Sequence, residues 1–366
     1  MYAKDKRIVV TLDAGGTNLV FNAIKENKEI TKSLKKTTHS DNLDLCIQSI
    51  RDGFAEIIER LDAKPVAISF AFPGPADYPN GVIGGFLPNF PSFRDGVALG
   101  PYLEKEFKIP VFINNDADLF VYGEALAGAL PRINEKLAHF GSDKKYQNLI
   151  GFTWGTGLGV GITVNQRLHI GDNSCSEVFC LPQRDNSNII VEDGASIRAI
   201  QRVYGEKSGN QNHKLEPDEI FQIAEGTREG DRQAAIDAFA AFGEIAGDVI
   251  ATVVTLIDGL VVIGGGISNA AKYIMPSVLK VLHSKIVTVS GETLNRVQMK
   301  TYNLDDDNEF KCFVQGESRK IKIYGYEEEI TYDPLKRIGI TISTLDTSHA
   351  VALGAYAFAL HSIDNQ

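Results

Sequence analysis

The chain has 366 residues, of which 43% are hydrophobic and 23% are charged, a composition typical of a globular protein large enough for two domains. Its formal net charge of −10, from 37 basic and 47 acidic residues, argues against general nucleic-acid binding. No apolar run reaches the length that spans a bilayer, and the chain starts without a signal-peptide pattern. We therefore expect a cytoplasmic protein with no membrane and no nucleic-acid partner.

A glycine-rich turn, Asp13-Ala14-Gly15-Gly16-Thr17-Asn18, joins two apolar runs over 8–12 and 19–24 and predicts a β-hairpin. Glycines let backbone N–H groups approach an anion closely, and Thr17 adds a hydroxyl donor. Asp13 supplies an oxygen that could hold a hydrated Mg²⁺. The turn suits the phosphates of a nucleotide, although a Gly-Gly pair between apolar runs is more commonly a plain hairpin turn.

The same pattern returns near the middle of the chain. Gly155-Thr156-Gly157 lies between an apolar run that ends at Trp154 and another that starts at Leu158. A repeated Gly-Thr hairpin suggests a duplicated unit, with two loops around one nucleotide. No carboxylate in the second loop matches Asp13, so we expect the two loops to differ in chemistry. A third glycine turn, 264–266, follows the predicted strand 260–263.

Between these turns the apolar spacing predicts a series of helices and buried strands. Strands are expected over 66–72 and 111–113, and helices in 37–61, 99–107, 218–224, 232–257 and 349–360. Residues 300–335 break this rhythm with charge runs and alternating apolar residues, and we interpret them as a β-rich surface excursion.

Asn115 and Asp116 follow directly after the predicted strand 111–113, where a helix begins. An amide and a carboxylate at a strand end can form hydrogen bonds with neighbouring hydroxyl groups, and the carboxylate can accept a proton from one of them. Asn and Asp are also common helix caps, and spacing alone favours capping over catalysis.

Taken together, these stretches resemble the ROK family of sugar kinases. The resemblance rests on Asp13-x-Gly-Gly-Thr-Asn, Pro73-Gly-Pro, Pro88-Asn89, Asn115-Asp116, Gly155-Thr-Gly-x-Gly-x-Gly and Gly264-Gly-Gly, in this order. It implies the actin-like, ribonuclease-H-like ATPase fold, an α/β fold with two domains and a cleft between them. The expected small domain is 1–117 plus a returning helix in 348–366, and the larger is 118–347 with the insertion around 300–335.

The family pattern also implies roles for single residues. Asp116 would be the general base that deprotonates a sugar hydroxyl for attack on the γ-phosphate of ATP. Asp13 would hold Mg²⁺, with water between the ion and the carboxylate. The expected sugar ligands are Asn89, Asn115, Glu177 and Glu192, and the expected nucleotide-binding residues are Gly15, Gly16, Thr17, Gly155, Thr156, Gly157, Gly265 and Gly266.

Two departures from the family pattern concern zinc and the sugar. Where the family has Glu-x-Gly-His, this chain has Glu177-Val178-Phe179-Cys180, and residues 181–191 contain none of the cysteines of the family zinc motif. The four cysteines of the chain form no CxxC pair, so we expect no structural zinc. Loss of the histidine changes the contacts at the anomeric end of the sugar.

The function we expect is transfer of the γ-phosphoryl group of ATP to the 6-hydroxyl of a hexose or N-acetylhexosamine. A non-catalytic sugar-binding regulator, a degenerate kinase and another ATPase of the same fold are the alternatives. Retention of Asp13, Asn115 and Asp116 argues against a degenerate site. A homodimer is expected by analogy with the family alone.

Overall fold

The computed structural model describes residues 2–365 except 16, 75, 86, 88 and 210–214. The chain divides into two units. The first comprises residues 1–132, 161–176 and 344–366, and the second comprises 133–160 and 177–343. The first unit therefore takes in more of the chain than the range 1–117 with 348–366 expected from the sequence.

The first unit is built on a six-stranded sheet with the order β3-β2-β1-β5-β8, in which β4 also pairs with β2. Its strands are β1 (Val9–Ala14), β2 (Asn18–Lys25), β3 (Lys28–Glu29), β4 (Leu34–Thr37), β5 (Ala67–Ala71) and β8 (Val111–Asn114). Strands β1 and β2 form the predicted antiparallel hairpin, while β5 runs parallel to both β1 and β8. Because parallel strands end at one edge, the residues after β1, β5 and β8 gather there.

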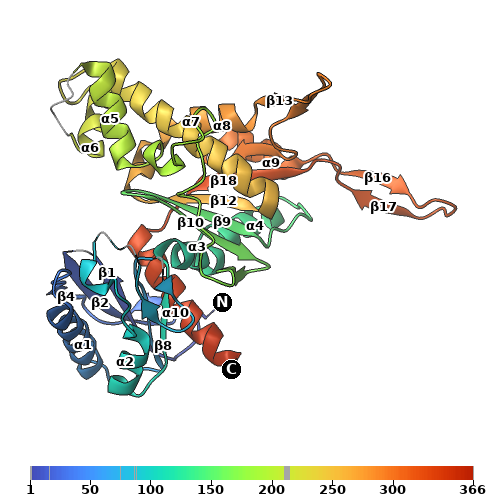
Figure 1. Cartoon of the computed structure of the whole chain (residues 1–366). Helices are drawn as coiled ribbons and strands as arrows, with labels where there is room; N and C mark the ends of the chain where they lie inside the picture. The colour runs from blue at the N-terminus through green and yellow to red at the C-terminus, as the bar shows by residue number, and fades with distance from the viewer. Residues whose placement is uncertain are drawn as a thin grey trace. The chain divides into compact units, whose positions relative to one another are not determined.

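Helices cover both faces of this sheet (Figure 1). They are α1 (Leu43–Glu59), α2 (Leu99–Phe107), α3 (Asp116–Ala127) and α10 (Thr347–Asp364). One core joins α1 and α2 to the sheet through residues such as Phe54, Phe70 and Leu103. A second cluster joins Tyr356 of α10 to Val9 on the other face. Smaller elements of this unit are β6 (Ala76–Asp77), β7 (Val82–Ile83), the 3₁₀ turn η1 (Pro91–Phe93) and β11 (Arg167–Leu168).

The central sheet of the second unit has the order β11-β10-β9-β12-β18-β15. Its strands are β9 (Leu149–Trp154), β10 (Leu158–Val164), β12 (Leu260–Gly264), β18 (Arg337–Ile342) and β15 (Lys300–Asn303), and β10 runs on into the first unit at Gly161. Every residue of β12 is buried, as expected of a strand paired in parallel on both sides.

The second unit also holds most of the remaining helices. They are α4 (Ala129–His139), which begins in the first unit, α5 (Ile197–Ser208), α6 (Pro217–Glu225), α7 (Arg232–Ile257), α8 (Ala271–Leu282) and α9 (Asp307–Gln315), with 3₁₀ turns η2 (Val191–Asp193) and η3 (Gly266–Ala270). Two hairpins, β13 (Lys285–Val287) with β14 (Thr293–Asn295) and β16 (Arg319–Lys322) with β17 (Glu329–Tyr332), form separate two-stranded sheets.

Helix α7 is long and apolar enough to cross a membrane by length and composition. It is instead packed as a core helix against α8. Gly243 and Gly247 on α7 allow this approach, because a Cβ at either position would press on the backbone or side chains of α8. The predicted range 232–257 is confirmed.

The interpretation of 300–335 as a β-rich surface excursion is wrong for its first half. Strand β15 is the edge strand of the central sheet, where it pairs with β18, and its residues Thr301 and Tyr302 are buried. The acidic run 305–309 belongs to the start of α9, where Asp306 accepts hydrogen bonds from the N–H groups of Asn308 and Glu309. By composition alone, an N-cap among acidic residues looks like a solvated charge run. Only β16 and β17 match the expectation.

Helices α3 and α10 cross at two glycines. A Cβ on Gly123 would collide with the carbonyl oxygen of Ala350, and a Cβ on Gly354 with that of Leu119. Because glycine has no side chain, the two backbones can touch. This contact fixes α3, whose first residue is Asp116, against the helix that begins beside β1.

We predict that Gly354→Ala lowers the free energy of unfolding by about 2–4 kcal/mol, because the added methyl group overpacks a backbone contact that has no room to yield. Denaturant titration would measure the loss. Ser362→Ala, on the last turn of the same helix, is the matched control and should change stability by less than about 0.5 kcal/mol. Equal stability of both variants with the wild type would contradict the tight crossing.

Candidate functional site

In the first unit, the site is organised by the start of α3. Asn115 is the N-cap of this helix, and its Oδ1 accepts a hydrogen bond from the N–H of Ala117 at 2.8 Å. Oδ1 of Asp116 accepts from the same N–H, also at 2.8 Å. The capping role weighed from the sequence is therefore confirmed for Asn115. Capping also fixes the carboxylate of Asp116 at the helix N-terminus, next to the end of β8.

The environment of Asp116 raises the pKa of its carboxyl group above the ordinary value of 3.8. The largest cause is loss of hydration at the carboxyl group, although Asp116 as a whole residue is exposed. The negative charge of Asp13 raises the pKa further, whereas the hydrogen bond from Ala117 lowers it. A higher pKa makes the carboxylate a better proton acceptor, as a general base requires.

Asn89 lies on an exposed loop of the same unit. The loop is anchored by Phe90, whose ring packs on Phe72 with 4.6 Å between centroids. Phe72 follows β5 directly, and its N–H donates to the carbonyl oxygen of Asn114 at 3.0 Å. The loop of Asn89 is thus tied to the edge of the sheet where β5 and β8 end.

Asp13 is the last but one residue of β1, and it is exposed. The hydroxyl of Ser348 donates to its Oδ2 at 3.3 Å. A cavity of about 130 Å³ borders both side chains and is also lined by Asn22, Glu29 and His349. The carboxylate is open to an ion beside it, so Asp13 fits the expected contact with hydrated Mg²⁺. Sequence reasoning missed Ser348, although it lies at the start of the predicted C-terminal helix.

The first glycine turn is closed by its own backbone. The N–H of Gly15 donates to the carbonyl oxygen of Asn18 at 3.0 Å. The hydroxyl of Thr38 donates to the carbonyl oxygen of Gly15 at 2.6 Å. The N–H of Gly15 is therefore already engaged, while Thr17 is exposed. Gly16 lies outside the described residues. Thr38 is a buried brace for the turn that sequence reasoning did not identify.

In the second unit, the second glycine turn meets Glu192. Oε2 of Glu192 accepts from the N–H of Leu158 at 3.2 Å, and a Cβ on Gly157 would lie 2.6 Å from this oxygen. Oε1 forms an ion pair with Arg198 at 3.1 Å. The structure therefore brings Glu192 to the loop of Gly155, Thr156 and Gly157, where it holds the turn.

The third glycine turn, which follows β12, lies against the end of β9, the strand that precedes the second turn. Gly265 follows β12 with φ of 89°, and a Cβ there would collide with the backbone of Trp154 at the end of β9. Only glycine fits this position. By contrast, a Cβ on Gly155 or Gly266 would meet no atom within 4 Å. The two turns thus border open space, which fits the expected close approach of a nucleotide to the backbone.

Glu177 is half-buried on the loop that precedes η2. Backbone hydrogen bonds hold this loop against the segment that contains Glu192. The N–H of Val191 donates to the carbonyl oxygen of Leu181 at 2.8 Å, and the N–H of Glu192 donates to the carbonyl oxygen of Phe179 at 3.3 Å. The two expected sugar ligands of the second unit therefore lie on paired segments.

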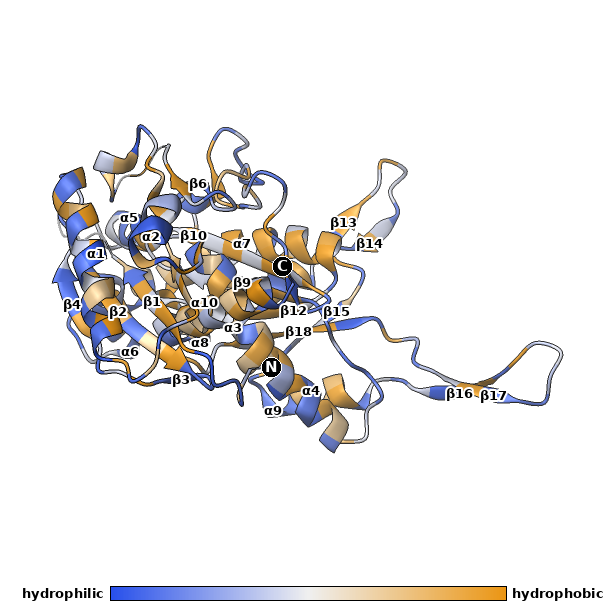
Figure 2. Ribbon diagram, turned by 90° about the horizontal axis from the view of Figure 1, so that it is seen from below, coloured by the Kyte–Doolittle hydropathy of each residue, from blue (hydrophilic) through white to orange (hydrophobic). Residues whose placement is uncertain are grey.

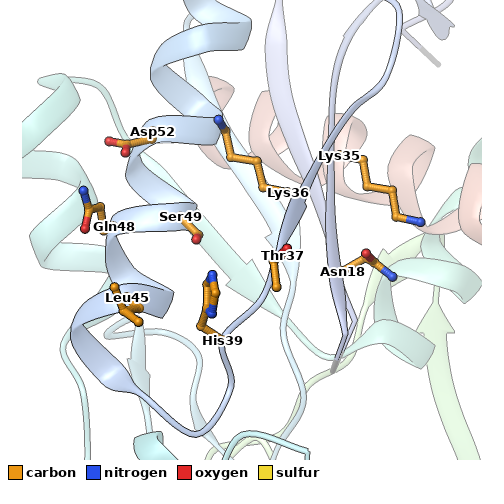
Figure 3. A pocket seen from close by; sticks show the side chains of 9 residues that line it. All are labelled: Asn18, Lys35, Lys36, Thr37, His39, Leu45, Gln48, Ser49 and Asp52. Atoms are coloured by element: carbon orange, nitrogen blue, oxygen red, sulfur yellow. The ribbon is translucent and has the colours of Figure 1, made fainter.

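A larger pocket of about 480 Å³ lies on the first unit beside the first glycine turn. Figure 3 shows Ser49 of α1 and Thr37 of β4 on its two sides, with His39 near them. Of the expected site residues that the structure describes, none lines it. Two of its charged side chains are already paired, Lys36 with Glu56 at 3.0 Å and Asp52 with Arg51 at 2.7 Å.

No group of three or more His, Cys, Asp or Glu side chains suited to a metal ion occurs among the described residues. Cys175, Cys180 and Cys312 are exposed free thiols, and Cys46 is buried. The expectation of no structural zinc stays a prediction.

Comparison with known proteins identifies the family of this chain. The ROK family model matches residues 9–308. A glucokinase from Thermotoga maritima is 27% identical over 77% of this chain and 94% of its own length. The crystal structure of a glucokinase from Parabacteroides distasonis is 50% identical, covers 99% of each chain and has a TM-score of 0.91. The structure of a ROK hexokinase from Thermus thermophilus, 18% identical over 97% of this chain and 99% of its own, matches in fold with a TM-score of 0.65.

The two α/β units thus have the actin-like ATPase fold of the ROK sugar kinases, and this chain belongs to the ROK family.

Proposed function

We propose that this chain transfers the γ-phosphoryl group of ATP to the 6-hydroxyl of glucose, with Asp116 as general base. At the coarser level the chain is an ATP-dependent carbohydrate kinase. Glucose is favoured because the relative that is 50% identical over nearly the whole chain is described as a glucokinase. The observation that carries the mechanism is the position of Asp116, capped at the end of β8 with a raised pKa.

In this mechanism the residues of the first unit act on the sugar. Asp116 accepts the proton of the attacking hydroxyl as the new bond forms, so that charge does not build up on the sugar oxygen. The amide groups of Asn89 and Asn115 orient the sugar hydroxyls. Asn115 does this with its amide nitrogen, because its Oδ1 already caps α3. A fixed orientation of the attacking oxygen supplies much of the rate gain in phosphoryl transfer.

The second unit supplies further proposed contacts. Glu177 and Glu192 accept hydrogen bonds from sugar hydroxyls, and Glu192 can do so while it keeps its bond to Leu158. Thr17 of the first unit and Thr156 donate hydroxyl groups to phosphate oxygens. The glycines of the three turns, Gly15, Gly155, Gly157, Gly265 and Gly266, let the nucleotide lie close to the backbone. Bound ATP would supply the phosphoryl group, and Asp13 is the residue that would hold Mg²⁺, an ion that would offset the charge of the phosphates.

Two other functions have support among the relatives. An N-acetyl-D-glucosamine kinase from Vibrio parahaemolyticus is 24% identical over 70% of this chain and 83% of its own length, which makes an N-acetylhexosamine the second candidate substrate. A xylose repressor from Bacillus spizizenii is 29% identical over 33% of this chain. A regulator without turnover is an alternative on that ground, although Asp116 with a raised pKa favours catalysis.

We predict that, with MgATP, the chain phosphorylates glucose with a kcat/KM at least about tenfold above that for mannose, fructose, allose, N-acetylglucosamine or N-acetylmannosamine, a ratio within reach of one or two altered pocket contacts. Coupled ADP release measures this directly. A preference for either N-acetylhexosamine would replace glucose as the substrate. Sugar binding by thermal shift without turnover of any sugar would support the regulator or the degenerate kinase.

We predict that Asp116→Asn lowers kcat by at least about 10²-fold, within the range seen for loss of a general base, with little change in sugar affinity. Single-turnover phosphorylation and sugar titration would separate the two effects. Asp44→Asn, in the first turn of α1, is the control and should keep normal kcat. A turnover of Asp116→Asn close to the wild type would remove Asp116 from the role of base.

The raised pKa of Asp116 also predicts a pH dependence. Its carboxyl group binds a proton more tightly in the folded chain than in the unfolded chain, so folding stability is lost as the pH rises from the ordinary value of 3.8 through the folded pKa. Asp116→Asn should therefore raise the free energy of unfolding at pH 7 and lose this advantage as the pH falls toward 3.8. Denaturant titrations across this range measure the difference. A variant less stable than the wild type at pH 7 would contradict the raised pKa.

A further inference from the structure

The segment 192–198 binds the second glycine turn at both of its ends. The N–H of Ile197, the first residue of α5, donates to the carbonyl oxygen of Gly155 at 3.0 Å. At the other end, the N–H of Leu158 donates to Oε2 of Glu192 at 3.2 Å. The first bond joins two backbones. The second depends on a side chain, so it requires a fixed orientation of the Glu192 carboxylate.

Arg198 fixes that orientation. Its Nη2 lies 3.1 Å from Oε1 of Glu192 and 3.6 Å from Oδ1 of Asp193. With Arg198 on one oxygen and the N–H of Leu158 on the other, the carboxylate of Glu192 cannot rotate without losing a contact. An ionised carboxylate has about four lone-pair sites, so about two of them remain for the hydroxyl groups of a ligand. The direction of these remaining sites is set by Arg198.

The ion pair between Arg198 and Glu192 contributes little to the stability of the fold. The side chain of Arg198 is 57% exposed, and ion pairs on exposed side chains contribute little net free energy. Helix α5 is held instead by apolar packing, since Ala199, Ile200 and Tyr204 are buried. The helix packs against α7, whose hydrophobic residues are orange in Figure 2.

The position of Arg198 within α5 is electrostatically unfavourable for the helix. Arg198 is the second residue of α5, and the first turn contains no acidic residue. The helix dipole places partial positive charge at this end, where a cation is repelled. The contacts with Glu192 and Asp193 offset this repulsion. The stability of α5 therefore does not explain Arg198, whereas the orientation of Glu192 does.

We propose that Arg198 is a positioning residue for sugar binding that acts through the carboxylate of Glu192. The proposal rests on the proposed function, in which Glu192 accepts hydrogen bonds from sugar hydroxyl groups. Arg198 engages one oxygen of Glu192 and thereby directs the remaining lone pairs toward the sugar. Loss of Arg198 weakens sugar binding. It leaves proton transfer to Asp116 unchanged, because Asp116 is held by the cap of α3.

Arg198→Ala tests the proposal with the sugar that has the highest kcat/KM. We expect its dissociation constant, measured by isothermal titration calorimetry, and its KM to rise about tenfold, while kcat changes less than about twofold, as for a loss of uniform binding. Arg198→Lys keeps the cation without the planar guanidinium, and should restore the dissociation constant to within about threefold of the wild type. Lys207→Gln removes an ion-paired cation from the last turn of the same helix. This control should leave both constants unchanged.

A double-mutant cycle shows whether Arg198 acts through Glu192. Glu192→Gln should itself weaken sugar binding. In that background, Arg198→Ala should raise the dissociation constant less than about twofold further, because residues that share one contact are not additive. Additive losses would overturn the proposal. So would a dissociation constant that Glu192→Gln raises and Arg198→Ala leaves unchanged, with the proposed sugar contact of Glu192 intact.

Two further results would also overturn the proposal. If Glu192→Gln leaves sugar binding unchanged, the proposed sugar contact of Glu192 fails, and the role of Arg198 fails with it. If Arg198→Ala lowers the denaturation midpoint strongly and Arg198→Lys does not restore sugar binding, Arg198 serves the fold. We expect instead that the denaturation midpoint of Arg198→Ala stays close to that of the wild type, because the side chain is exposed.

Discussion

The crossing of α3 and α10 is the contact on which the proposed site of the first unit depends. Gly123 and Gly354 let the two backbones touch, so neither helix can slide without a collision. Helix α3 begins at Asp116, and α10 begins with the turn whose Ser348 holds Asp13. Two carboxylates that lie far apart in the chain are therefore positioned by one helix pair.

This arrangement places two negative charges close enough for Asp13 to raise the pKa of Asp116. Without a bound cation, the repulsion between the two carboxylates is unfavourable, and a cation at Asp13 would reduce it. The same cation would lower the pKa of Asp116. Under the proposed roles of Asp13 and Asp116, a cation bound with the nucleotide at Asp13 would therefore be coupled electrostatically to proton acceptance by Asp116.

The sequence could predict the hairpins and the helices 99–107 and 232–257 because their apolar periodicity is strong and local. The positions of Asn115 and Asp116 at a strand end were also predictable. The bonds of Ser348 to Asp13 and of Thr38 to Gly15 were not, since they join distant residues through single hydroxyl groups. Helix α9 was missed because its cap sits in a run of acidic residues, where composition hides the hydrogen bond.

The loop of Glu177 is held in place by its backbone. The family pattern has a histidine where this chain has Cys180, which is exposed. Here the loop is held by backbone hydrogen bonds on either side, from Val191 to Leu181 and from Glu192 to Phe179. Backbone bonds do not depend on the side chain at position 180. The conformation of the loop that carries Glu177 is therefore set by the pairing of two chain segments.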